Sequence, residues 1–500
     1  MTHFDTIIVG GGAAGCVVAA RLSEDPARKV LLLEAGGTDE RPDVTAPEAW
    51  PATLGSDIDW GYSTVVQRAT GRSYPAHRGK VLGGSSSINL MTHIRGHRAD
   101  FDNWAYNGAS GWGYEDVLPY FRKSEDVPGG DERYRGRGGP LRPRPAANPH
   151  PLTHAHVEAA RQAGHAVMED VNGPALMGAV IQDVLIENGR RQSPATAYLR
   201  PAMARANLTV KTGVTVQKLL FEGLRCTGLE YADAGGLHRQ TAGGVVLSAG
   251  SFDTPKLLML SGIGPADDLR ALGLQTLLDL PGVGRNLHDH LLLAGIRYHA
   301  EKPLPPPTGN YAESTLFMKT NAGQVAPELQ IVNVQVDYHT PHQTPVPNSI
   351  TFGIGHMRPQ SRGSLRLASA NVADAPLIDY DYLGELYDMD QLIAGIEEVH
   401  RLTQTGVFSQ WGGRSGTDAL MALDRQDLER TVIDGVSSYF HPVGTCRMGV
   451  DAMAVTDPAL KVRGIEALWV ADASVMPTIV SSNTAAATIM IGEKAADLIR

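Results

Sequence analysis

The chain has 500 residues, of which 42% are apolar, and it carries a formal net charge of −10 at pH 7. This length and composition predict a globular protein of two or three domains. The acidic balance argues against nucleic acid as a partner, because phosphate binding requires a basic face. One local exception, residues 133–144, holds five arginines among glycines and prolines. We interpret that segment as a solvated loop.

Three cysteines, Cys16, Cys226 and Cys446, are sparse and show no CxxC spacing. They indicate neither a disulfide framework nor a zinc site, so a reducing compartment and the absence of a metal are expected. The start of the chain lacks a basic region of the signal-peptide type, and no apolar run reaches the roughly 18 residues of a membrane span. The sequence therefore predicts a soluble, cytoplasmic protein with no membrane partner.

The first 34 residues have the pattern of a cradle for an adenine dinucleotide. Residues 4–9 are a β-branched run, a glycine-rich turn spans 10–15, a small-residue helix runs to Ser23, and a second strand, 30–33, precedes Glu34. In this fingerprint each glycine has a separate role: a tight turn, close approach of the backbone to the pyrophosphate, and packing of the helix on the strand. The helix N-terminus offers free N–H groups to the phosphates. The expected contacts are Gly10, Gly12, Ala13, Ala14 and Gly15.

Glu34 ends the second strand at the distance expected for a residue that accepts hydrogen bonds from ribose hydroxyls. With its neighbour Ala35, it is predicted to lie beside the adenosine. A carboxylate at this position would repel a 2′-phosphate, so NADP is not expected.

Later elements follow in order. Alternating strand and helix patterns run to about residue 125, and a Gly/Arg/Pro-rich stretch, 128–150, interrupts them. A helix is predicted over 152–165, strands over 208–231, and a short apolar strand over 244–249 before a helix at 254–260.

From residue 328 to 367 the pattern changes to longer alternating strands, which predict an antiparallel sheet with one wet or ligand-facing side. The Pro-rich stretch before it, 302–308, is compatible with a lid or with a surface connection. A long helix is expected over 388–403. A final strand, 468–471, and a helix, 485–499, indicate that the chain returns to complete the nucleotide domain.

Three sets of motifs together resemble the glucose-methanol-choline (GMC) oxidoreductase family. The first set runs from Arg78-Gly79-Lys80 to Asn89, the second from Gly250 to Pro265, and the third comprises 441–449, 471–477 and the pair Asn483-Thr484. The resemblance covers nearly the whole chain, and its nearest branches are pyridoxine 4-oxidase-like and choline dehydrogenase-like members.

The resemblance implies FAD as the cofactor and an α/β fold of the glucose oxidase and cholesterol oxidase type. A Rossmann-like FAD-binding domain, residues 1–150, 190–290 and 450–500, would accompany a substrate domain, residues 151–189 and 291–449, whose antiparallel sheet is flanked by helices. Carried over by motif, the further cofactor contacts are Trp60, Val81, Gly83, Gly84, Ser85, Asn89, Met91, Thr92, Val216, Ala249, Gly250, Asp472, Ala473, Asn483 and Thr484.

The same resemblance implies that His441 and Asn483 are the catalytic pair. A neutral imidazole with a pKa near 6.5 can take the hydroxyl proton of an alcohol while the flavin accepts the hydride. Asn483 would orient the substrate oxygen. Members that bind FAD covalently have histidine where this chain has Ile88, so a non-covalent FAD is expected. The pair His288/His290 is interpreted as part of a structural stretch near the cofactor, because adjacent ligands without a third partner make a poor metal site.

The predicted reaction is oxidation of a small or medium primary alcohol, including aromatic and heteroaromatic ones, to the aldehyde. Pyridoxine 4-oxidase-like members carry proline where this chain has Asn483, and the choline branch shares the His/Asn pair. A hydroxynitrile lyase of the same fold and a choline-type dehydrogenase are the alternatives. A nicotinamide-dependent dehydrogenase fits only the N-terminal fingerprint. Oxygen or a quinone-type acceptor is expected to reoxidise the flavin, and no oligomeric state is predicted.

Overall fold

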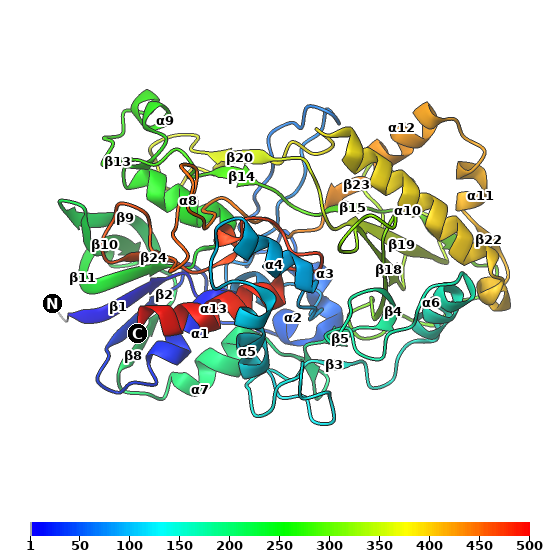
Figure 1. Ribbon diagram of the computed structural model, residues 1–500, viewed down its shortest axis with the longest axis horizontal. Helices are drawn as coiled ribbons and strands as arrows, with labels where there is room; N and C mark the ends of the chain where they lie inside the picture. The colour runs from blue at the N-terminus through cyan, green and yellow to red at the C-terminus, as the bar shows by residue number, and fades with distance from the viewer. Residues whose placement is uncertain (1–2) are drawn as a thin grey trace.

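The computed structural model describes residues 3–500 and contains two large β-sheets, one toward each end of the long axis (Figure 1). Strand β1 (Phe4–Val9) lies at the middle of the first sheet, between β2 (Val30–Leu33) and β11 (Gly236–Leu247). Its Ile7 and Ile8 side chains point to opposite faces and are both fully buried. This explains why the strand reads as a continuous apolar run, as central parallel strands do.

The first sheet has seven strands in the order β8-β2-β1-β11-β10-β9, with β24 (Leu468–Val470) also paired with β11. The strands β8 (Leu208–Lys211), β2, β1, β11 and β24 run parallel, while β9 (Thr215–Glu222) and β10 (Arg225–Asp233) form antiparallel pairs at one edge. The last helix, α13 (Ala485–Ile499), packs against α1 (Ala13–Leu22) and α5 (Tyr114–Ser124). The end of the chain therefore lies beside its beginning.

The second sheet is antiparallel and has eight strands. Its main path is β22-β16-β19-β18-β17-β4, and β15 pairs with both β19 and β23. The bounds are β4 Gly178–Ile181, β15 Leu291–Leu293, β16 Arg297–His299, β17 Ser314–Met318, β18 Leu329–Val334, β19 Ser349–His356, β22 Arg414–Ser415 and β23 Val436–Ser438. The helices α6 (Pro151–Gln162) and α10 (Leu386–Gln404) pack on it.

Shorter elements join the two sheets. The other α-helices are α2 Pro42–Thr45, α3 Trp50–Thr53, α4 Arg98–Tyr106, α7 Arg200–Ala202, α8 Gly250–Leu260, α9 Ala266–Ala271, α11 Thr417–Leu420 and α12 Arg425–Gly435. The other strands are β3 Arg144–Pro145, β5 Asp183–Val184, β6 Ile186–Glu187, β7 Arg190–Arg191, β12 Ile263–Gly264, β13 Leu278–Asp279, β14 Arg285–Leu287, β20 Gly363–Arg366 and β21 Leu377–Asp379. Short 3₁₀ turns span Pro47–Ala49, Gly84–Ser87, Val407–Trp411 and Ala473–Val475, and a π-helical turn spans Ala195–Leu199.

The predicted fold class is confirmed, with two refinements. The helix expected over 254–260 begins earlier, at Gly250, because the chain turns directly out of β11 into α8. One face of the antiparallel sheet lines a cavity, through Gln330 and Val332 of β18, which are buried, and helices cover the other face.

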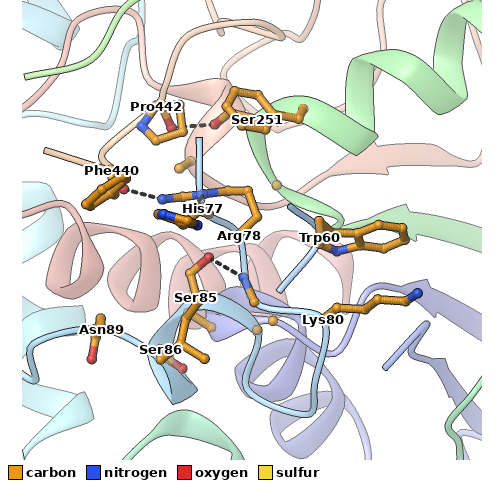
Figure 2. Close-up of a pocket in the computed structure, with 18 of the residues that line it drawn as sticks. Trp60, His77, Arg78, Lys80, Ser85, Ser86, Asn89, Ser251, Phe440 and Pro442 are labelled. Atoms are coloured by element: carbon orange, nitrogen blue, oxygen red, sulfur yellow. Dashed lines mark hydrogen bonds between the residues drawn. The ribbon is translucent and has the colours of Figure 1, made fainter. Parts of the chain in front are cut away.

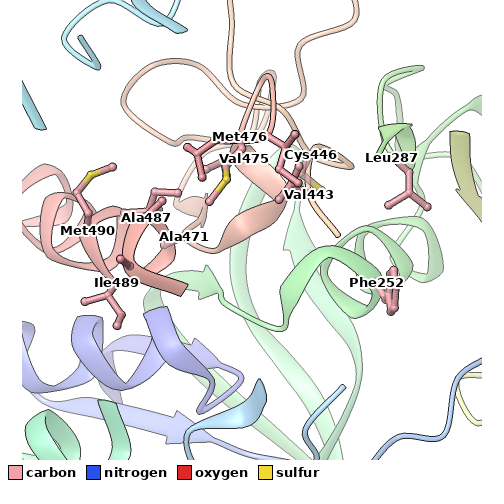
Figure 3. Packing of buried hydrophobic residues seen from close by; sticks show 14 of the residues in the cluster. Phe252, Leu287, Val443, Cys446, Ala471, Val475, Met476, Ala487, Ile489 and Met490 are labelled. Carbon is pink, nitrogen blue, oxygen red and sulfur yellow. The ribbon is translucent and has the colours of Figure 1, made fainter. Parts of the chain in front are cut away.

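One apolar cluster joins the C-terminal segments to the first sheet. Figure 3 shows Val443 and Cys446 beside Val475 and Met476, close to α13. All four side chains are fully buried. The segments that carry His441 and Asn483 are thus fixed to a common core. No helix among residues 3–500 is long and apolar enough to span a membrane, and the three cysteines are unpaired and buried.

The interpretation of residues 133–144 as a solvated loop is wrong for Arg135, the one of its five arginines that is buried. The Arg135 side chain is buried and forms ion pairs with Glu125 (2.9 Å), Asp170 (2.6 Å) and Asp183 (2.7 Å). Arg95 reaches the same Glu125 carboxylate at 2.5 Å. A buried arginine needs such partners, because an unpaired charge in the interior is costly. Composition alone does not distinguish this arginine from its exposed neighbours.

This buried ion cluster generates the first prediction. Replacing Glu125 with Gln leaves the Arg95 and Arg135 charges without their shared partner, and the free energy of unfolding should fall by about 3–5 kcal/mol. Urea unfolding followed by circular dichroism measures it. The control is Arg133→Ala, which removes an exposed arginine of the same loop whose ion pair is with the partly exposed Asp131; it should change stability by less than about 0.5 kcal/mol. Equal stability of Glu125→Gln and the wild type would contradict a structural role for the cluster.

Candidate active site

One cavity of about 950 Å³ runs from the first sheet to the second. Its wall combines the turn after β1, the loop that contains Trp60 and Arg78 (Figure 2), and the start of α8. Strands β15, β18 and β19 and the segments around residues 441 and 483 close the other end. A cavity of this size at the ends of parallel strands is where open α/β sheets bind dinucleotides.

The N-terminal turn has the geometry that a pyrophosphate requires. Gly10 has φ +97°, and a Cβ there would lie 2.5 Å from the carbonyl oxygen of Ser248. A Cβ on Gly15 would lie 1.9 Å from the Gly10 carbonyl oxygen, so only glycine lets α1 pack this closely. Gly12 differs, since the nearest atom to a Cβ there is 3.7 Å away. The space beside Gly12 belongs to the cavity, as a bound phosphate needs.

Glu34 lies on the cavity wall and is almost fully buried. Its carboxylate accepts hydrogen bonds from the backbone N–H groups of Gly11 (2.7 Å) and Gly36 (2.8 Å). Burial nevertheless raises the pKa of Glu34 to about 7. A carboxylate held at the end of β2 in this way suits ribose hydroxyls, which would donate further hydrogen bonds to it.

Two further glycine-rich segments approach the same region. Gly84 has φ +54°, and a Cβ there would lie 2.9 Å from the Cα atom of Gly12, so the second loop touches the first. The carboxylate of Asp472 accepts from the backbone N–H of Gly250 (2.9 Å) and from the Thr254 hydroxyl (2.6 Å). Asp472 thereby fixes the start of α8 at the cavity wall.

Most of the predicted site residues line this one cavity. They are Gly10, Gly12, Ala13, Ala14, Glu34, Ala35, Trp60, Gly84, Ser85, Asn89, Thr92, Val216, Ala249, Gly250, His441, Asp472, Ala473, Asn483 and Thr484.

Four predicted cofactor contacts are not on the wall: Gly15, Val81, Gly83 and Met91. Val81 is buried in a small cluster with Val44, Ile58 and Ile88. Gly83 donates its N–H to the Gly11 carbonyl at 2.7 Å, which joins the two loops. Met91 has φ +60° and is buried. These four residues lie behind the cavity wall and support it. A family motif includes residues that contact the ligand and also residues that set the conformation of the loop.

His441 and Asn483 meet at the far end of the cavity. The amide nitrogen of Asn483 lies 3.3 Å from Nε2 of His441. The two residues are 42 positions apart, and the common apolar core described above brings their segments together. The amide oxygen of Asn483 accepts from the amide of Gln330 on β18 at 3.3 Å.

Two backbone carbonyls determine which nitrogen of His441 is protonated. Nε2 of His290 lies 3.1 Å from the Met357 carbonyl oxygen and 3.0 Å from that of Val480. Carbonyl oxygens only accept, so Nε2 carries the hydrogen, and a neutral His290 has its lone pair on Nδ1. That lone pair faces Nδ1 of His441 at 2.9 Å. The hydrogen of His441 therefore lies on Nδ1, and the lone pair on Nε2 faces Asn483.

The electrostatics agree with this assignment. Burial lowers the pKa of His290 to about 3, so that ring is neutral at physiological pH. The pKa of His441 is also well below its ordinary value, first because of burial and then because of the neighbouring His290 and the positive charge of Arg78. A neutral imidazole with its free nitrogen toward a cavity can accept a proton.

The sequence 288–290 has a larger role than the structural stretch that we expected. Nε2 of His288 accepts from the Ile479 backbone N–H at 2.9 Å, and Asp289 accepts from the His441 backbone N–H at 2.7 Å. With His290, these side chains join the segments of both candidate catalytic residues. Among residues 3–500 no group of three or more potential ligands could hold a metal ion. The sequence contains one sign of this role: three ionisable residues stand directly before the buried strand β15, and each needs a hydrogen-bond partner in the core.

The fold and the cavity are those of a dinucleotide-binding protein in which His441 and Asn483 lie side by side at the far end of the cavity. A family model for GMC oxidoreductases matches residues 4–292 with its N-terminal part and 359–492 with its C-terminal part. The chain belongs to the GMC oxidoreductase family. It is accordingly an FAD-dependent enzyme that acts on the CH–OH group of donors.

The relatives support this assignment. The chain is 40% identical to a mitochondrial choline dehydrogenase of Homo sapiens, over 100% of this chain and 90% of that protein. It is 38% identical to an oxygen-dependent choline dehydrogenase of Brucella ovis, over 99% and 95%. Among solved structures, pyridoxine 4-oxidase from "Mesorbium loti" superimposes with a TM-score of 0.95 at 36% identity, covering 99% of this chain and 98% of that one. A formate oxidase of Aspergillus oryzae superimposes with a TM-score of 0.91 at 28% identity, covering 100% and 98%.

The open space at Gly12 generates the second prediction. Gly12→Val should leave the fold intact, because no atom lies within 3.7 Å of the new Cβ, but it should largely abolish FAD binding. Flavin absorbance per protein measures occupancy. Gly37→Val is the control: Gly37 is exposed, and a Cβ there meets nothing within 4 Å, so full occupancy is expected. A folded Gly12→Val protein with full occupancy would mean that the phosphates bind elsewhere.

Proposed function

We propose that this enzyme oxidises a primary alcohol to the aldehyde, with His441 as the base and Asn483 as the residue that orients the substrate oxygen. The observation that carries the proposal is the lone pair on Nε2 of His441, directed at the cavity end where Asn483 lies. Removing a hydride from carbon requires removing a proton from oxygen, and this pair offers both an acceptor nitrogen and an adjacent amide.

Bound FAD supplies the hydride acceptor. The glycine-rich turn at 10–15, Gly84 and Asp472 would hold it, and Glu34 would accept from its ribose. At the far end Nε2 of His441 takes the hydroxyl proton, while the Asn483 amide donates to the substrate oxygen and fixes its direction.

The substrate end of the cavity favours a small or medium uncharged alcohol, including aromatic and heteroaromatic ones. Its wall contains the aliphatic Leu292, Val332 and Val334 and the rings of Tyr338 and Tyr439. Among the described residues, the carboxylates on the cavity wall all come from the first sheet or the elements beside it: Glu34, Asp233, Asp253 and Asp472.

A choline-type alcohol is the second candidate, favoured by the choline dehydrogenases at 38–40% identity and by the two tyrosine rings, since aromatic faces bind quaternary ammonium groups. Choline and its uncharged carbon analogue, 3,3-dimethylbutan-1-ol, therefore both belong in the substrate panel. We propose oxygen or a quinone-type molecule as the electron acceptor and a cytoplasmic location.

We further propose that the two domains have the separate binding roles expected from the motifs. Residues 1–150, 190–290 and 450–500 bind the cofactor, and residues 151–189 and 291–449 bind the substrate. Strand β24 supports the discontinuous arrangement, because it pairs with β11 of the first sheet.

We also propose that FAD is bound without a covalent link, since Ile88 on the cavity wall has no nucleophilic atom. This is the third prediction: acid precipitation of the holoenzyme should leave the yellow colour in the supernatant. A commercial flavoprotein with covalent flavin serves as the control for the procedure. Flavin retained in the washed pellet would show that another residue forms the bond.

The fourth prediction concerns the base. His441→Ala should bind FAD normally and lose roughly 10²–10⁴-fold in the rate of anaerobic flavin reduction by a good alcohol, the usual effect of a positioned general base. Asn483→Ala should lose less, because one hydrogen bond to a neutral group contributes about 0.5–1.5 kcal/mol. Stopped-flow absorbance measures both rates.

The same experiment separates the alternatives. A hydroxynitrile lyase would not bleach the flavin with any alcohol. Wild-type reduction rates in His441→Ala would mean that another group takes the proton.

A further inference from the structure

The peptide bond between Phe440 and His441 is held at both of its ends. The carbonyl oxygen of Phe440 accepts a hydrogen bond from Nη2 of Arg78, as Figure 2 shows. The N–H of His441 donates to Oδ1 of Asp289 at 2.7 Å. Arg78 and Asp289 are 211 positions apart in the chain, and only the folded site brings both to this peptide group.

The conformation at this point needs such support. Phe440 has φ +63°, in the left-handed region that side chains with a Cβ rarely adopt. Residues in such conformations persist where the surroundings hold them, and they cluster at active sites. The Ser438 hydroxyl also accepts from the Phe440 N–H at 2.8 Å and donates to Asp289 at 2.5 Å. The backbone before His441 is therefore fixed at three consecutive polar groups.

The two charged groups match the polarity of the peptide. A guanidinium faces the carbonyl oxygen, and a carboxylate faces the N–H, so each charge stabilises the opposite partial charge. The Arg78 guanidinium also donates, through Nε, to the His77 carbonyl. Asp289 accepts also from the Tyr382 hydroxyl at 2.6 Å. Both groups are thus committed to the backbone and side chains around the base.

We propose that Arg78 and Asp289 are positioning residues, which hold the strained Phe440–His441 peptide and thereby keep the ring of His441 directed at Asn483. This inference rests on the proposed role of His441 as the base. In this proposal Arg78 and Asp289 affect the reaction although neither contacts the hydroxyl proton or the carbon atom that loses the hydride. Because they act through Phe440, their effect should depend on the strain at that residue.

The dependence on strain gives the fifth prediction. Arg78→Met should lower the anaerobic rate of flavin reduction roughly 10²-fold, the effect of misplacing a catalytic group by about 1 Å. In a Phe440→Gly background the loss should shrink to about tenfold or less, because glycine adopts the left-handed region without strain. Phe440→Ala is the matched control. It removes the same ring but keeps the Cβ, so the full loss should remain.

A pH profile provides a readout that loosened packing would not change. The positive charge of Arg78 lowers the pKa of His441, so Arg78→Met should move the acid limb of the reduction rate to higher pH. Arg78→Lys, which keeps the charge and a donor, should restore the wild-type limb and part of the rate. The flavin content of each variant is measured first, because Arg78 also lines the cavity.

If Arg78→Met does not retain FAD, Asp289→Asn is measured instead, in the same wild-type, Phe440→Gly and Phe440→Ala backgrounds. Equal losses in the wild-type, Phe440→Gly and Phe440→Ala backgrounds would overturn the positioning role. If His441→Ala slows flavin reduction but the effects of the Arg78 and Phe440 substitutions simply add, only this inference is wrong. If His441→Ala reduces flavin normally, the proposed function itself is wrong.

Discussion

The hydrogen bonds from His290 to two backbone carbonyls are the constraint on which the chemistry of this site depends. The carbonyls of Met357 and Val480 belong to different segments, one at the end of β19 and the other before Asn483. Together they fix the hydrogen of His290, and through it the lone pair of His441. The protonation pattern of the base is therefore a consequence of how the second sheet meets the C-terminal segment. Side-chain identity alone would leave either tautomer open.

The stretch from His288 to His290 acquires its importance from its place in the chain. It follows β14 and precedes β15, where the chain leaves the small β14-β20-β21 sheet and enters the antiparallel sheet of eight strands. All three side chains are buried; His288 contacts the backbone of Ile479, whereas Asp289 and His290 both contact His441. An interior group of this kind is stable only when fully hydrogen-bonded. The hydrogen bonds that offset the cost of burying these side chains also align the segments that carry His441 and Asn483. The same contacts therefore stabilise the fold and set the geometry of the site.

The fold was predictable to the extent that local pattern determined it. The β-branched run of β1, the small residues of α1 and the alternation in β18 each matched their observed element, because strand and helix periods appear directly in sequence. Buried charge was not predictable in the same way. Arg135 and its exposed neighbours have the same composition, and only the folded chain brings Glu125 and Asp183 to one of them. The motif likewise did not separate Gly84, on the cavity wall, from Gly83, one residue behind it.

The cofactor end and the substrate end differ in how much the sequence reveals, and the reason is physical. A pyrophosphate approaches backbone N–H groups, so the binding loops must omit side chains at fixed positions such as Gly10 and Gly12, and the omission is visible as glycine. The substrate end presents Leu292, Val332 and Tyr439, whose spacing follows strand geometry whether or not a ligand touches them. Any apolar residue of similar size would keep the sheet intact at those positions. The reaction class is therefore encoded in motifs, whereas the particular alcohol is encoded in the shape of a wall that only the folded structure displays.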